Sequence, residues 1–304
     1  MATVGIIIVT YNSAAEIGAC LDAALATDAE IVVVDNASSD STVKEVTERS
    51  VRLIANKENR GFAGAVNQGF AVLSCPYLLL LNPDSVLLAG LNTLRAACDL
   101  PGSAGAGGQL LDAHGQPQTG FMVRELPTAI TLALEALLLN RIWPNNPVNR
   151  RYRALGRDYS RQFKVGQPAA AFLMVRRQVW QELGGFDESF YPIWFEDVDF
   201  CQRIHQRGLS LYYVPDAVAK HTGGHSIPQL AVEIRRIYWY RSLLRYSAKH
   251  FRPVAFRGVC AAVAVGSIFR SVAEAILQRS VKPLTGHGMV IRLAGRCMLS
   301  GLRP

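Results

Sequence analysis

The sequence predicts an α/β fold with a helical extension at its C-terminal end, and three observations predict it. Short apolar runs alternate with amphipathic segments along the first hundred residues. These apolar runs are unbroken, as in strands of a parallel sheet that helices cover on both faces. After Ile227 the pattern changes to long helical stripes rich in basic residues. Strands that alternate with helices along the chain are typical of a doubly wound sheet.

The expected elements follow one another closely in the first hundred residues. Strands are indicated by β-branched or leucine-rich runs, and helices by apolar residues every three or four positions, such as Ile17, Leu21 and Leu25. Asp40 or Ser41 is a suitable N-cap for the second helix. We expect strands at residues 4–9, 31–34, 51–55 and 77–81, and helices at residues 14–26, 41–49 and 61–73.

Between residues 101 and 227 the pattern is less regular. A stretch rich in Gly, Ala and Gln at 101–120 predicts a strand and turns, and Gly208 ends the helix expected at 197–206. The other expected elements are a helix at 129–139, a basic loop with five arginines at 150–161, a strand at 169–175, and a last strand at 211–214 followed by Pro215 and Asp216.

Size and composition indicate a globular protein with a substantial core. The chain has 304 residues, of which 50% are hydrophobic and 18% charged, so we expect one large domain with an extension. Six scattered cysteines without a C-x-x-C pair indicate neither a zinc site nor a disulfide framework, and they favour a reducing compartment. The first residues lack the basic region and cleavage site of a signal peptide, so we expect a cytoplasmic protein.

The last quarter of the chain holds the whole positive excess. Residues 1–227 carry 19 Lys and Arg against 22 Asp and Glu, whereas residues 228–304 carry 13 basic residues and two acidic ones. We therefore expect an α/β domain at 1–227 and a basic amphipathic helical extension at 228–304. Because the extension is also apolar, an anionic membrane surface is favoured over nucleic acid as its partner.

A membrane-spanning segment is not expected in this extension. Its longest charge-free run, residues 258–269, has 12 residues, whereas a spanning helix needs about 20. A helix that lies in the membrane interface fits better. An ordinary helical cap with a solvated basic face is the alternative.

Most polar motifs of the first domain come directly after an expected strand. Because the carboxyl ends of parallel strands open into one crevice, we expect these side chains to meet there. The acidic members suit a divalent cation and a proton acceptor. The set is Thr10-Tyr11-Asn12, Asp35-Asn36-Ala37-Ser38, Asn59-Arg60-Gly61-Phe62-Ala63 with Asn67, Asn82-Pro83-Asp84, Glu196-Asp197-Val198-Asp199 and His221.

The order and spacing of these motifs over residues 4–226 resemble the inverting nucleotide-sugar glycosyltransferases of family 2, and among them bacterial rhamnosyltransferases that act on lipid-linked acceptors. The resemblance implies the GT-A fold, with a mixed, mostly parallel sheet and helices on both faces. It also implies which residues contact a nucleotide-sugar donor. These are Thr10, Tyr11, Asn12, Asp35, Asn36, Ser38, Asn59, Gly61, Phe62, Ala63, Asn67, Asn82 and Asp84.

The resemblance implies a metal site at Asn82-Pro83-Asp84. The family has Asp-x-Asp here, and Asn82 replaces the first aspartate, so Asp84 remains as the strong oxygen ligand. His221 is the expected imidazole ligand for Mg²⁺ or Mn²⁺, with His225 as a competing candidate. Without the other motifs, Asn-Pro-Asp would be an ordinary turn signal.

The resemblance also places the catalytic base in the Glu-Asp pair. Inverting transfer needs one base that deprotonates the acceptor hydroxyl, and Asp197 is the expected base, supported by Glu196 and Asp199. Clustered carboxylates raise one another's pKa, which suits a base. The alternative is that three acids merely complement a helix N-terminus.

The implied function is the transfer of a single sugar from a nucleotide donor to a polyprenyl-diphosphate-linked saccharide in cell-envelope polysaccharide synthesis. The sugar is expected to be L-rhamnose from dTDP-rhamnose, and the protein peripheral on the inner face of the cytoplasmic membrane. The Gln-x-x-Arg-Trp motif of processive members is absent. The alternatives are galactofuranosyl or glucosyl transfer, or a non-catalytic sugar-nucleotide-binding protein. A nucleotidyltransferase would need a Gly-rich phosphate loop, which residues 10–16 do not form.

Overall fold

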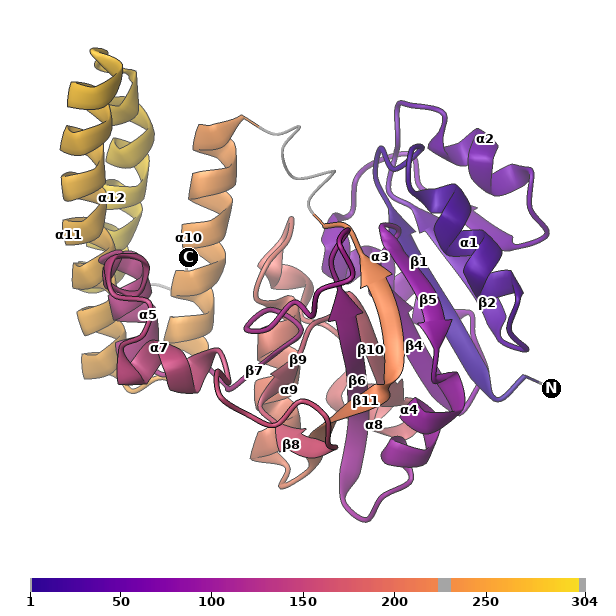
Figure 1. Cartoon of the computed structure of the whole chain (residues 1–304). Helices are drawn as coiled ribbons and strands as arrows, with labels where there is room; N and C mark the ends of the chain where they lie inside the picture. Colours follow the sequence, from indigo (N-terminus) through magenta and orange to yellow (C-terminus); the bar gives the residue numbers. More distant parts are fainter. Residues whose placement is uncertain (1, 224–230, 301–304) are drawn as a thin grey trace. The chain divides into compact units, whose positions relative to one another are not determined.

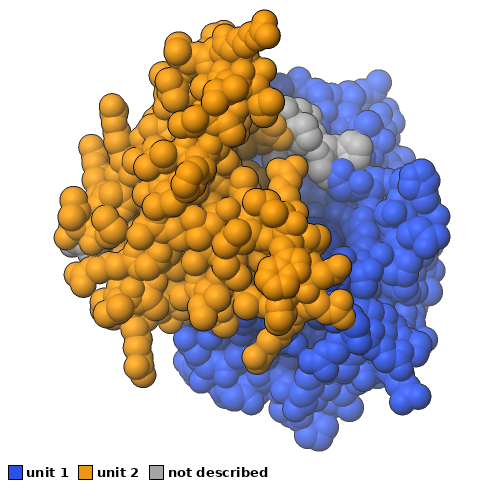
Figure 2. Space-filling view, turned by 60° about the vertical axis from the view of Figure 1, so that its left-hand side comes forward, with its two compact units in different colours: residues 1–126, 153–192, 196–226 blue, residues 127–152, 193–195, 227–304 orange. Residues whose placement is uncertain are grey.

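A computed structural model describes residues 2–223 and 231–300 and divides the chain into two compact units. Unit 1 contains residues 1–126, 153–192 and 196–226, and unit 2 contains residues 127–152, 193–195 and 227–304 (Figure 2). The C-terminal extension therefore folds together with two segments from earlier in the chain, which the sequence pattern does not associate with it.

Unit 1 is built on a mixed sheet of nine strands (Figure 1). The strands are β1 (Val4–Thr10), β2 (Glu30–Asp35), β3 (Arg52–Ala55), β4 (Tyr77–Leu81), β5 (Ser85–Ala89), β6 (Ser103–Leu111), β8 (Phe163–Val165), β10 (Phe172–Arg176) and β11 (Ser210–His221). Their order is β3-β2-β1-β4-β10-β6-β11-β5, with β8 paired to β11. Six strands run in one direction, because only β10, β5 and β8 are antiparallel to their neighbours. This confirms the expected mostly parallel sheet.

Helices cover this sheet, and its central strands are mostly buried as a result. Every residue of β1 is buried, as unbroken apolar runs predict. Helix α3 packs against β1 and β2, and α4 packs against β6 and β11. The helices of unit 1 are α1 (Ile17–Leu25), α2 (Thr42–Thr47), α3 (Gly61–Ala71), α4 (Leu91–Cys98), α8 (Arg177–Leu183), the short 3₁₀ helix η1 (Glu188–Phe190) and α9 (Glu196–Gln206). A small second sheet pairs β7 (Val123–Arg124) with β9 (Gln167–Pro168).

The last strand corrects one expectation. It does not end before Pro215 but continues to His221, because a register shift between Val214 and Val218 takes the proline out of the ladder with β6. His221 is therefore the last residue of β11, and it does not follow the strand as expected.

Unit 2 is helical. Its helices are α5 (Ala129–Ala136), α6 (Leu139–Ile142), α7 (Pro147–Tyr152), α10 (Val232–His250), α11 (Pro253–Gln278) and α12 (Lys282–Ser300). Helix α11 packs against α5, α10 and α12. At Gly266 a Cβ would lie 2.1 Å from the Ala136 carbonyl oxygen, so glycine permits the close approach of α11 and α5.

Among residues 2–223 and 231–300, α11 is the one helix that is long and apolar enough to cross a membrane by length and composition alone. Its 26 residues span about 39 Å at 1.5 Å per residue, and its most apolar window has a mean hydropathy of 1.7. The expectation that no segment reaches spanning length is therefore wrong, because the helix continues through Arg257 and Arg270. A core helix of a soluble protein passes the same test, and 39% of this window is buried within the protein.

Candidate functional site

The first two motifs meet where β1 and β2 end. Thr10 and Asp35 are paired in register, and both side chains are buried. Thr10 Oγ1 donates to Asp35 Oδ1 at 2.9 Å, and the Ser38 amide donates to Asp35 Oδ2 at 2.9 Å. Ser38 Oγ accepts from the Asn12 amide at 2.9 Å, beside the partly exposed Tyr11. Protein donors thus already bind both oxygens of the Asp35 carboxylate. Its expected contact with a nucleotide base stays a prediction.

Asn36 connects the second motif to the third. Its Nδ2 donates to Asn59 Oδ1 at 2.9 Å and to the Gly61 carbonyl at 3.1 Å. Its Oδ1 accepts from the Arg60 amide at 2.8 Å. Asn36 is buried, so in this structure it positions the loop that leads into α3.

The start of α3 is partly covered by the segment before residue 193. Gly61 has a φ of 74°, and a Cβ there would lie 2.8 Å from the Tyr191 ring, so glycine is required. The Phe62 amide donates to the Pro192 carbonyl at 2.8 Å, and Ala63 is buried. The Phe62 amide at the N-terminus of this helix therefore serves a protein contact here, and the expected donor contact of Phe62 stays a prediction.

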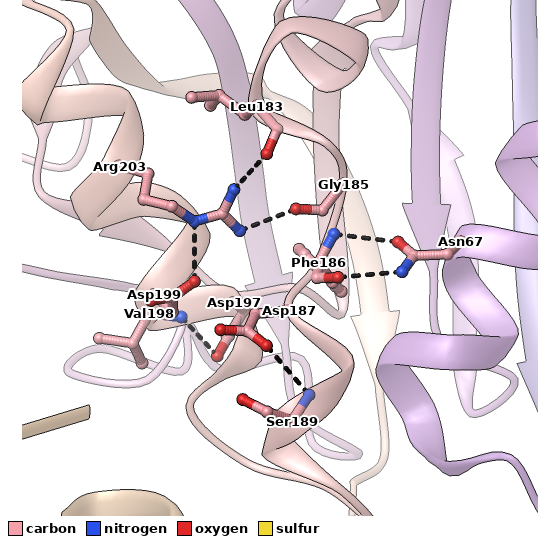
Figure 3. A network of polar contacts seen from close by, with 10 residues as sticks. All are labelled: Asn67, Leu183, Gly185, Phe186, Asp187, Ser189, Asp197, Val198, Asp199 and Arg203. Atoms are coloured by element: carbon pink, nitrogen blue, oxygen red, sulfur yellow. Dashed lines mark hydrogen bonds and ion pairs between the residues drawn. The ribbon is translucent and has the colours of Figure 1, made fainter. Parts of the chain in front are cut away.

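Asn67 and Arg203 hold the turn after α8 from two sides (Figure 3). Asn67 exchanges two hydrogen bonds of 2.9 Å with the backbone of Phe186. Arg203 donates to Asp199 Oδ2 at 2.8 Å and to the Gly185 carbonyl at 2.7 Å. Asp199 is fully buried in this ion pair. Any support that it gives to Asp197 would therefore be structural, through the position of α9 and the turn after α8.

Asp84 and His221 lie together although 137 residues separate them. His221 Nε2 is 3.6 Å from Asp84 Oδ1, which is buried and has no hydrogen-bond partner. The Gln118 Nε2 amide donates to the His221 carbonyl at 2.8 Å, so Gln118 Oε1 faces His221 Nδ1 at 3.0 Å and accepts a hydrogen bond from it. The ring of Phe121 stacks on the imidazole with centroids 5.2 Å apart. Gln118 thereby directs Nε2 toward the carboxylate.

This donor set fits a hard divalent cation in part. A carboxylate oxygen and an imidazole nitrogen suit Mn²⁺ or Mg²⁺, and a buried acceptor without a partner is what a missing cation would leave. Within the described part of the chain, however, no three His, Cys, Asp or Glu side chains gather closely enough to hold a metal alone. The competing candidate His225 lies outside the described residues.

The Glu-Asp pair opens α9. Burial raises the pKa of Glu196 well above its ordinary value, and the neighbouring Asp197 raises it further. Burial also raises the pKa of Asp197, which is partly exposed. Asp197 Oδ2 accepts from Gln167 Nε2 at 2.9 Å. Figure 3 shows the second bond, in which Oδ1 accepts from the Val198 amide at 2.8 Å. A carboxyl with a raised pKa is a competent proton acceptor near neutral pH.

The two residues before this pair have a strained backbone. Trp194 and Phe195 have φ angles of 79° and 70°, which bulky side chains rarely adopt. Within unit 2, Phe195 packs against Trp239 and Tyr246 of α10, with ring centroids 6.2 and 5.6 Å apart. Strained backbone that surrounding contacts hold in place is common beside functional groups.

One short segment supports both acidic sites. The Ala170 amide donates to Asp197, and the next carbonyl, that of Ala171, accepts from the Asn82 amide at 3.1 Å. Arg124 provides a second connection: its charge lowers the pKa of Asp197, and its guanidinium lies 5.6 Å from the Phe121 ring. The metal-ligand candidates and the base candidate thus share one scaffold.

The sequence does not single out Gln118, Phe121, Arg124 or Gln167, because none belongs to a motif and each acts through a distant partner. The roles expected for the donor-binding, metal-binding and catalytic residues stay predictions. A separate hollow lined by Tyr77, Asp99, Arg176 and Arg177 lies where β4 begins, and none of the predicted site residues lines it.

Comparisons with known proteins agree with this arrangement. The family model described as Glycosyl transferase family 2 matches residues 5–179, more than half of the chain. The chain is 28% identical over 276 residues to the N-acetylglucosaminyl-diphospho-decaprenol L-rhamnosyltransferase of Mycobacterium tuberculosis, covering 80% of this chain and 88% of that protein.

Two solved structures share the fold. The mannosyltransferase PcManGT from Pyrobaculum calidifontis, in complex with GDP-Man and Mn²⁺, has a TM-score of 0.53 and 18% identity, covering 98% of this chain and 87% of that one. GalNAc-T7 with UDP, GalNAc and Mn²⁺ has a TM-score of 0.58 and 14% identity, covering 81% of this chain and 48% of that one. At these identities the likeness concerns the fold alone.

Proposed function

The chain belongs to glycosyl transferase family 2, and we propose that this glycosyltransferase transfers one L-rhamnose from dTDP-rhamnose to a polyprenyl-diphosphate-linked saccharide, with inversion at the sugar. The activity of the M. tuberculosis relative, whose similarity extends over most of both chains, supports the donor sugar and the lipid-linked acceptor. The reaction would serve cell-envelope polysaccharide synthesis at the inner face of the cytoplasmic membrane, where the basic extension would meet anionic lipids.

One observation carries the proposal: a base candidate and a metal-ligand pair lie on a shared scaffold at the carboxyl-terminal side of the sheet. Asp197 and the Asn82-Pro83-Asp84 motif both bond to the residues just before β10. Inverting transfer needs these two functions together, because one group activates the acceptor hydroxyl while another stabilises the leaving diphosphate.

Asp197 is the proposed base. It would take the proton of the acceptor hydroxyl as that oxygen attacks the sugar, and no covalent intermediate on the protein is needed. Burial raises the pKa of Glu196, which favours its neutral form and disfavours a second negative charge beside the base. Gln167 orients the carboxylate through its hydrogen bond to Oδ2.

Asp84 and His221 are the proposed protein ligands of Mg²⁺ or Mn²⁺. When bound, the cation would neutralise the donor diphosphate and the charge that develops on it as it leaves. Because this proposed pair is smaller than a complete ligand set among the described residues, the diphosphate is expected to supply further ligands. Asn82 offers a neutral carbonyl in place of the usual first carboxylate.

Titration calorimetry against UDP-, GDP- and dTDP-sugars with Mg²⁺ or Mn²⁺ tests the proposal. We expect dTDP-rhamnose to bind at least tenfold more tightly than the others, and to lose affinity in EDTA. His221→Ala should lose the metal dependence, whereas the matched control His114→Ala, at an exposed turn, should keep it. Preferred binding of UDP-galactofuranose or a UDP-hexose would keep the family and reject the rhamnosyl assignment.

A further inference from the structure

The second half of α11 has an apolar outer face. Val265, Ile268, Phe269, Val272 and Ile276 are exposed and recur at the three- and four-residue spacing of one helix face. Phe269 is 70% exposed, and Leu277 at the end of the helix is 82% exposed. We call these six residues the α11 face. It is about 18 Å long, at 1.5 Å per residue.

The charged side chains of the same stretch turn into unit 2. Arg270 Nη1 donates to the Ala136 carbonyl at 2.9 Å, and its guanidinium lies 5.3 Å from the Tyr240 ring. Glu274 accepts two hydrogen bonds of 3.0 Å from Arg236 of α10. His287 of α12, fully buried, has its Nε2 3.3 Å from Glu274.

This arrangement is the reverse of an ordinary water-soluble helix. Such a helix buries its apolar stripe and exposes its charges. Here Arg270 and Glu274 are partly buried, where desolvation is costly, and large apolar side chains are exposed, where hydration is unfavourable. Both costs disappear where apolar side chains face lipid and charged groups pair with one another inside the protein.

We propose that the α11 face is a membrane-docking surface whose occupant is the acyl layer of an anionic bilayer. The proposal rests on the function proposed above, since a lipid-linked acceptor requires the enzyme at a membrane. Arg279 and Lys282 are exposed next to Leu277, where they meet anionic headgroups. Charge complementarity therefore favours an anionic surface over a second copy of this positively charged unit.

Docking parallel to the membrane follows from the surroundings of α11. Its opposite side packs against α5, α10 and α12. Those neighbours expose Arg241 on α10 and Arg292 on α12, which would have to enter the hydrocarbon if α11 crossed the bilayer with them. The face therefore inserts from the side, and its binding has an apolar component that salt does not screen.

Vesicle flotation of the full chain tests the proposal, with Phe269→Gln/Ile276→Gln as the test variant and Leu25→Gln/Leu88→Gln as the control. All four side chains are exposed, so thermal melts should match the wild type. On vesicles of phosphatidylcholine with phosphatidylglycerol in 1 M salt, the test variant should bind at least tenfold less than wild type and control. The Arg279→Gln/Lys282→Gln variant should bind less than the wild type at low salt. In 1 M salt the two should bind equally, because salt already screens the basic contacts.

Equal binding by the test variant and the wild type would overturn the proposal. A wild-type dimer in light scattering that the test variant dissociates, with flotation unchanged, would assign the face to a second copy and also overturn it.

Failure of the proposed function would look different. The test variant should transfer sugar to a short-chain, water-soluble acceptor at the wild-type rate and lose transfer to a long-chain acceptor in vesicles. If the wild type transfers no sugar to either acceptor, yet its flotation depends on Phe269 and Ile276, the docking surface stands and the transferase proposal fails.

Discussion

Asp197→Asn should remove the base and leave the fold intact. The Val198 amide can still donate to the remaining carbonyl oxygen. Gln167 donates to Asp197 now, and its own Oε1 is buried without a partner. Rotation of the Gln167 amide would let Oε1 accept from the side-chain NH₂ group that the substitution introduces. One hydrogen bond worth about 1 kcal/mol replaces another, so we expect stability to change by less than about 1 kcal/mol.

Transfer by this variant should fall by about 10²-fold or more, because an amide cannot accept the proton of the acceptor hydroxyl. That loss corresponds to about 2.7 kcal/mol in the activation barrier. The assay is the initial rate of acceptor glycosylation by chromatography, with donor affinity by calorimetry and unfolding by thermal melt. Donor affinity should stay at the wild-type value, because the base acts on the acceptor.

Gln167→Ala is the matched control for Asp197→Asn. It keeps the carboxylate and removes a hydrogen bond that lowers the pKa of Asp197. The acidic limb of its pH–rate profile should therefore move to higher pH, and its plateau rate should fall far less than that of Asp197→Asn, because the carboxylate remains. That limb reports the Glu196–Asp197 pair as a whole. A folded Asp197→Asn protein with turnover within tenfold of wild type would refute the assignment of the base.

The remaining predictions concern the metal site, the turn and the pH dependence. Asp84→Ala should bind donor more weakly in Mg²⁺ and lose the effect of EDTA; full activity of the wild type in EDTA would contradict this. Arg203→Lys should lower the free energy of unfolding in urea by at least about 2 kcal/mol, because lysine cannot reach all three acceptors. An unchanged unfolding midpoint would argue against a stabilising role of Arg203 at the turn after α8. Burial, together with the charge of Arg236, lowers the pKa of His287. As the pH drops, the unfolded chain takes up the proton before the folded chain does. The free energy of unfolding should therefore decrease as the pH drops below about 6.5, and His287→Gln should abolish that decrease.

The strands of the parallel sheet could be predicted from sequence because their signal is local. Residues 77–81 form a strand as expected, and β1 and β2 agree within one residue at each end. The end of β11 could not be predicted, because Pro215 normally ends a strand and the bulge that accommodates it depends on pairing with β6. The expected fold class is confirmed by the order and direction of the strands in the nine-stranded sheet.

The sequence pointed to the acidic residues and the histidine of the candidate site, but not to the side chains that orient them. Asp84 and His221 were paired by resemblance, and the structure does bring them together. Gln118 carries no signal of its own, since a glutamine in a Gly- and Pro-rich turn becomes informative only when its partner is known. Likewise, the inward turn of Glu274 toward Arg236 is a long-range contact that the charge-free run could not reveal.

Analysis of the anomeric product by NMR tests the central claim most directly. The full chain would be incubated with dTDP-rhamnose, Mg²⁺ and the acceptor named for the M. tuberculosis relative, N-acetylglucosaminyl-diphospho-decaprenol. The account predicts one added rhamnose with the anomeric configuration opposite to that in the donor, formed about 10²-fold or more slowly by Asp197→Asn. A product that retains the donor configuration, or equal product from wild type and Asp197→Asn, would contradict it.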